Sequence, residues 1–121
     1  MIGLRGLFTL FVASLMLVSC RHDTFPSIKD GDALRNDCIR LLEQFPQSEI
    51  PKAGWPRSVQ ALKPIRVTGR SNHIEILLHQ EPGKFTGGYD VFADPQLSPS
   101  NQGVWVQKTA VKGVYIFKMP Y

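Results

Sequence analysis

The chain has 121 residues, of which 43% are hydrophobic and 20% are charged, which favours one globular domain and excludes a disordered chain. The net charge is +4, and the lysines and arginines are dispersed along the sequence. Because a nucleic-acid-binding surface needs clustered positive charge, we predict no nucleic-acid partner.

Residues 1–19 have the features of a signal peptide. Arg5 supplies a positive charge, and an apolar stretch runs from Leu7 to Val18. Its length suits the apolar region of a signal peptide, roughly 7–15 residues, and is below the roughly 20 residues that a membrane-spanning helix needs. No second stretch of this kind follows, so we predict no transmembrane segment in the mature chain.

Leu17-Val18-Ser19-Cys20 ends this segment. It resembles the lipobox of bacterial lipoproteins, which implies that a signal peptidase cuts between Ser19 and Cys20 and that the Cys20 thiol carries a lipid with fatty chains such as palmitate. The partner implied is the membrane, and the location the cell envelope. Arg21 stands where an Asp would signal inner-membrane retention, so the outer membrane facing the periplasm is favoured in a Gram-negative cell. The alternative, an ordinary secretory signal, would favour an Ala-x-Ala-like site, which is missing.

Residues 20–29 are predicted to form a lipidated tether, and residues 30–121 a single small domain. The first element of the domain is a helix that starts near Asp30, whose carboxylate can accept hydrogen bonds from free backbone N–H groups. Apolar residues recur every three or four positions as far as Phe45, and Pro46 ends the helix. Cys38 lies among these apolar positions, so we predict a core residue rather than a catalytic thiol.

Residues 46–64 carry four prolines, so ordinary helix is not expected through most of this connector, although Ser58 could cap a single turn that runs to Leu62. Trp55 is predicted to pack over a sheet edge or a helix end, the alternative being a stacking platform for a ligand. The segment 50–64 resembles, faintly, a Trp-Pro and Leu-x-Pro pattern of small uncharacterised envelope proteins, which have no activity to carry over.

From Ile65 onward the hydrophobic pattern has a period of two, which predicts four or five short strands. Gly87-Gly88 inside one of them indicates a bulge, a bend or a close approach of backbones. The last strand is apolar on both faces at residues 114–117, which predicts an interior position. The fold class is therefore α+β, with one N-terminal helix packed on a mainly antiparallel sheet of four or five strands.

His73, Glu75 and His79 are candidate metal ligands, because alternation places all three on one face of a strand. The alternative is a half-exposed strand whose polar side chains face water. Asp90 and Asp94 form a further carboxylate pair, although exposed acids are common on strands and loops. No catalytic motif occurs, so no catalytic residue and no cofactor are predicted.

Two classes of function remain open, with a third that has no sequence signature. The first is a non-enzymatic interaction or scaffold module of the cell envelope, which binds a protein through a sheet face or an edge strand. The second is a small metal-binding or hydrolytic envelope protein that uses His73, Glu75 and His79. The third is an inhibitor of an external enzyme, which the size and the loops would suit.

Overall fold

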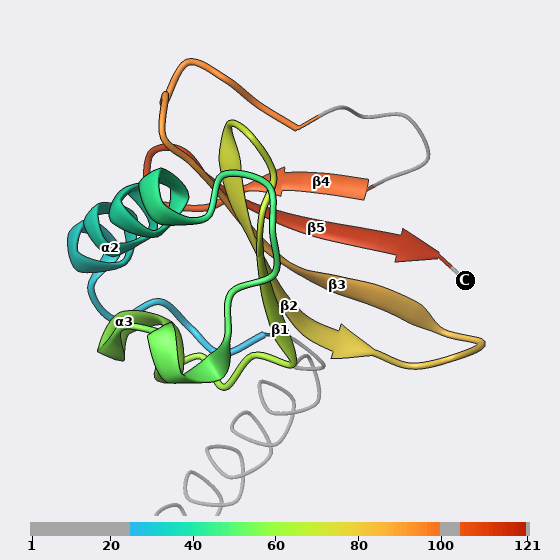
Figure 1. Ribbon diagram of the computed structural model, residues 1–121. Helices are drawn as coiled ribbons and strands as arrows, with labels where there is room; N and C mark the ends of the chain where they lie inside the picture. The colour runs from blue at the N-terminus through green and yellow to red at the C-terminus, as the bar shows by residue number, and fades with distance from the viewer. Residues whose placement is uncertain (1–24, 100–104, 121) are drawn as a thin grey trace, which may run out of the picture.

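The computed structural model describes residues 25–99 and 105–120. Ser19, Cys20 and the whole leader lie outside the described residues. The elements, in chain order, are α2 (Gly31–Gln44), η1 (Lys52–Gly54), α3 (Arg57–Gln60), β1 (Arg66–Gly69), β2 (His73–Gln80), β3 (Phe85–Phe92), β4 (Trp105–Lys108) and β5 (Val114–Pro120). All neighbouring strands are antiparallel, in the order β1-β2-β3-β5-β4 (Figure 1). The predicted α+β fold, with one main helix on a five-stranded sheet, is confirmed.

The main helix, α2, begins and ends where its sequence indicates. Asp30 Oδ1 accepts a hydrogen bond from the Ala33 N–H at 3.1 Å, which satisfies one of the free donors of the first turn. The helix ends at Gln44, before Pro46. Its buried residues lie on the stripe predicted from their spacing and are Leu34, Cys38, Leu41 and Leu42. Within the described ranges, no helix is both long and apolar enough to cross a bilayer.

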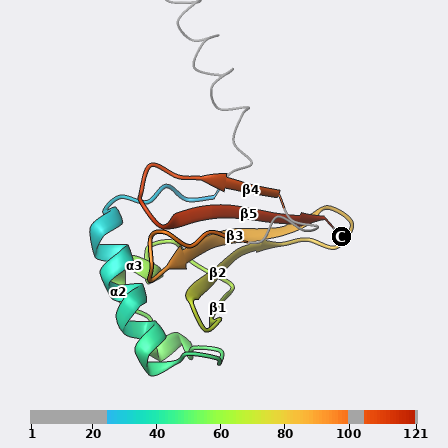
Figure 2. The same cartoon turned by 90° about the horizontal axis from the view of Figure 1, so that it is seen from above.

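The sheet has two faces with different partners. Both α2 and α3 lie on one side of it (Figure 2), and we call that side the helix face. Ile74, Ile76 and Val91 point to the helix face and belong to the same buried cluster as Leu34 and Cys38 of α2. This cluster is the main core of the domain, and the alternation of β2 delivers its apolar side chains to it.

The alternate side chains of each strand point to the opposite side of the sheet, which we call the far face. It includes Leu77, Phe92, Tyr115 and Phe117, all of which are buried. Phe92 and Tyr115 pack edge to face with ring centroids 5.7 Å apart. β5 lies between β3 and β4 and contributes buried residues to both faces. Its predicted interior position is therefore confirmed.

A β-bulge interrupts β2 opposite the paired glycines of β3. Leu77 pairs with Gly88, whereas His79 pairs with Gly87, so Leu78 is the extra residue. A Cβ atom on Gly88 would lie 1.8 Å from the Ile76 carbonyl oxygen. The two glycines therefore mark a bulge and a close backbone approach, as predicted, with the bulge on the partner strand.

The connector after α2 covers one edge of the sheet. Ile50 N–H donates to the Val67 carbonyl at 2.8 Å, and Gly69 N–H donates to the Ser48 carbonyl at 2.9 Å, along the outer side of β1. Trp55 is buried, and its Nε1–H donates to the Ile50 carbonyl at 3.0 Å. The prediction that Trp55 is a packing residue is confirmed, and it belongs to the buried core cluster.

Candidate functional site

Three potential metal ligands meet on the far face of the sheet. His73 and Glu75 are two residues apart on β2, and Asp90 is the direct cross-strand partner of Glu75 on β3. Each offers one ligand atom, and these atoms all lie within 4.8 Å of one another. His73 Nε2 and Asp90 Oδ1 lie 3.6 Å apart. The central strands of the sheet thus hold all three side chains in one small cluster.

His79 lies apart from this cluster. Gly87 and Gly88 are consecutive on β3 and face opposite sides, so the bulge moves His79 to the helix face while Leu77 stays on the far face. The His79 ring stacks on Phe85 with centroids 4.4 Å apart, and its Nε2 lies 3.1 Å from Glu81 Oε2. The prediction that His79 shares a face with His73 and Glu75 is wrong, because the extra residue Leu78 reverses the alternation of side chains beyond Leu77.

Asp90 is the member of the cluster that the sequence pattern alone does not group with His73. It is 7% exposed, and within the described residues its Oδ1 has no hydrogen-bond partner. Asp94, with which it was paired on spacing, lies in the following bend and accepts a hydrogen bond from the Gln96 N–H at 2.9 Å. One signal in the sequence could have indicated Asp90: it is a single acid between apolar neighbours at residues 89–92, a pattern that indicates a buried carboxylate. A buried carboxylate needs a partner, and this requirement points to a site.

The electrostatics of the cluster disfavour charge on its buried members. Burial raises the pKa of Asp90 to about 7; the Glu75 carboxylate acts in the same direction, and Arg70 opposes it. Burial lowers the pKa of His73, with Glu75 opposing the shift and Arg70 adding to it. The contact between His73 and Asp90 is therefore weaker than an ion pair near neutral pH, although the two groups lie within ion-pair distance.

The orientation of His73 is fixed from two sides. Its Nδ1 lies 2.7 Å from Asn72 Oδ1, an acceptor, and this contact assigns the ring proton to Nδ1. The ring also stacks on Phe92, with centroids 4.6 Å apart and an interplanar angle of 25°. The lone pair of Nε2 is consequently left on the side of Asp90.

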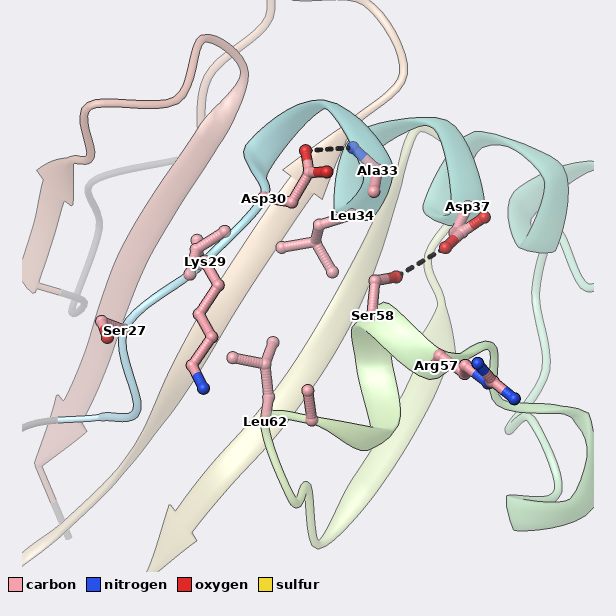
Figure 3. Close-up of a pocket in the computed structure, with 11 residues that line it drawn as sticks. Ser27, Lys29, Asp30, Ala33, Leu34, Asp37, Arg57, Ser58 and Leu62 are labelled. Carbon is pink, nitrogen blue, oxygen red and sulfur yellow. Dashed lines mark hydrogen bonds between the residues drawn. The ribbon is translucent and has the colours of Figure 1, made fainter.

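A separate groove of about 330 Å³ lies between residues 27–30, α2 and α3 (Figure 3). Leu34 and Leu62 line its apolar part. Figure 3 shows Ser58 directed at Asp37, and the Ser58 hydroxyl donates to Asp37 Oδ2 at 2.7 Å. This hydrogen bond ties α3 to α2, so we interpret the groove as a packing feature rather than a reaction site.

One imidazole and two carboxylates at this spacing have the chemistry to hold a divalent cation or to exchange a proton. Comparison of the chain with protein-family models, with curated proteins and with solved structures finds no match.

Proposed function

We propose that the chain is a bacterial lipoprotein precursor, cut before Cys20, whose domain acts as a non-enzymatic interaction module of the cell envelope. The observation that carries this proposal is the lipobox-like Leu17-Val18-Ser19-Cys20 a few residues before the packed chain. The positive start and the apolar stretch upstream of it support the same interpretation.

The packed chain begins close to the proposed anchor. The Phe25 ring contacts Phe85 and Tyr89 edge to face, at 6.3 and 5.9 Å, and the Tyr89 hydroxyl donates to the Pro26 carbonyl at 2.8 Å. Five Cα–Cα steps separate Cys20 from Phe25, and they span at most about 18 Å. A lipid on Cys20 would therefore hold the Phe25 end of the domain near the membrane surface.

An edge of the sheet is suited to binding a protein. The outer side of β1 is covered by residues 48–50, whereas among the described residues no strand pairs with the outer side of β4. Thr109 N–H donates to the Val114 carbonyl, so the alternation of an antiparallel ladder turns the backbone groups of Val106 and Lys108 outward. An extended segment of a partner protein could add to β4 through these groups.

The anchor is tested by labelling cells with an alkyne analogue of palmitate. The wild-type chain is expected to carry the label and to sediment with membranes, because the thiol of Cys20 is the only acceptor proposed. Cys20→Ala is expected to lose the label completely. Cys38→Ala is the matched control and is expected to keep it, since Cys38 is buried in the core. Label on the Cys20→Ala chain, or none on the wild type, would contradict the proposal.

The exposed edge is tested by photo-crosslinking in the same cells. A photo-reactive residue at Lys108 is expected to give one adduct of discrete mass, and Val106→Pro is expected to remove that adduct, because proline deletes an outward N–H without breaking the pairing to β5. A photo-reactive residue at Thr68, on the covered edge, serves as the control. Equal adducts at Lys108 and Thr68, or none at Lys108, would refute strand addition at β4.

A further inference from the structure

We propose that His73, Glu75 and Asp90 bind one Zn²⁺ ion on the far face of the sheet, independently of the lipid anchor and of the β4 edge. Two ligand atoms about 2.1 Å from a tetrahedral zinc ion lie roughly 3.4 Å apart. His73 Nε2 and Asp90 Oδ1 are 3.6 Å apart, close to that separation. The third ligand atom, from Glu75, lies within 4.8 Å of both, which a change of side-chain rotamer can close.

Asp90 supplies the second, independent observation. Its side chain is 10% exposed, and its Oδ1, which faces His73, has no hydrogen-bond partner within the described residues. A buried carboxylate oxygen is costly unless a donor or a cation compensates it. Asp90 also sits on the central strand β3, between its partners Glu75 on β2 and Tyr115 on β5. A cation bound there would satisfy this oxygen without moving the backbone.

His73 is oriented as a metal ligand. Metal-bound histidines usually donate their second ring N–H to an oxygen atom, which fixes the tautomer. Asn72 Oδ1 is in that position, 2.7 Å from Nδ1, so Nε2 keeps its lone pair on the Asp90 side. Stacking on Phe92 restricts rotation of the ring.

Glu75 completes the set of three ligands. Its side chain is 18% exposed, and Arg70 Nη2 contacts its Oε1 at 3.5 Å, leaving the second carboxylate oxygen for an ion. An imidazole nitrogen among the ligands favours zinc over magnesium or calcium, which prefer oxygen-only sites. Three protein ligands leave a fourth position for water or for a group of a bound partner.

The test is a Zn²⁺ titration of the purified full-length chain in detergent, without a polyhistidine tag and after removal of metals by chelation. We expect one equivalent to bind with a micromolar or lower dissociation constant. His73→Ala and Glu75→Gln are each expected to weaken binding more than about tenfold. His79→Ala and His22→Ala are matched histidine controls and are expected to bind as the wild type does. The Co²⁺ form is expected to show d–d absorption without thiolate charge transfer.

If His73→Ala disturbs folding, Glu75→Gln still decides the test. This substitution preserves the size of the side chain at a partly exposed position, so it is expected to leave the fold intact. Circular dichroism of each variant verifies the fold. The inference is overturned if the wild type binds no stoichiometric zinc, if Glu75→Gln binds as tightly as the wild type, or if His79→Ala abolishes binding. Each of these outcomes leaves the proposal for Cys20 untouched, so the two can fail separately.

Discussion

Replacing Gly88 with alanine is expected to destabilise the domain by about 3 kcal/mol or more. The added Cβ atom would lie 1.8 Å from the Ile76 carbonyl oxygen, 2.9 Å from the Ile76 carbonyl carbon and 3.0 Å from the Leu78 nitrogen. All three are backbone atoms, so no side chain can rotate away to make room. Because β3 is paired on both sides, the clash would disturb its ladder with β2 and strain the bulge.

The loss is measured by thermal unfolding of the full-length chain in detergent, followed by circular dichroism. A domain of this size is expected to lose roughly 4–8 °C of Tm per kcal/mol. Gly54→Ala is the matched control, because its Cβ would meet only Ile50 Cγ2, at 3.7 Å. A Gly88→Ala chain as stable as the Gly54→Ala chain would show that the two strands do not approach as closely as described.

Asp90→Asn is expected to stabilise the metal-free protein at pH 8 and to have little effect at pH 4. The pKa of Asp90 is raised from its ordinary value of 3.8 to about 7 in the folded chain, mainly by burial. Between these values the folded state holds a proton that the unfolded state has released, so the stability of the wild type falls as the pH rises from about 4 to about 7. At about 1.4 kcal/mol per pKa unit, the difference reaches a few kcal/mol.

Urea unfolding of both chains across this pH range, in the presence of EDTA, measures the effect. His73 acts in the opposite direction, since its lowered pKa costs stability as the pH falls below its ordinary value of 6.5. Comparing the wild type with Asp90→Asn at each pH isolates the carboxylate. A difference that is constant with pH, or that is largest at pH 4, would contradict a buried, unpaired Asp90.

The same substitution separates stability from binding. Asp90→Asn removes a charge that the metal-free fold accommodates poorly, and it also removes a ligand of the proposed zinc site. We therefore expect a chain that is more stable at pH 8 and that no longer gains stability from added Zn²⁺. Such a trade-off is common where a binding site keeps a group that the fold alone would not favour.

Local chemistry made much of the fold predictable. The limits of α2 follow from Asp30 and Pro46, and the burial of Cys38 follows from its place on the apolar stripe. The same burial, with the Asp37 carboxylate, raises the pKa of the Cys38 thiol, as expected for a core residue rather than a nucleophile. These features depend on neighbours in sequence, which alternation and helical spacing describe well.

The site was predictable only in part, because it depends on register. His73 and Glu75 were placed together correctly, since no irregularity separates them on β2. His79 was misplaced because the bulge at Leu78 lies between Glu75 and His79 on β2. The glycines that indicate this bulge stand on the neighbouring strand, β3. Asp90 joins Glu75 through a cross-strand pairing that the sequence alone does not set.

The most direct test of the lipoprotein proposal is the mass of the N-terminal peptide of the mature protein, isolated from membranes. We expect a peptide that begins at Cys20 and carries a diacylglyceryl group on its sulfur atom. A peptide that retains Met1 and the leader, or one that begins at Cys20 with an unmodified thiol, would contradict the proposal.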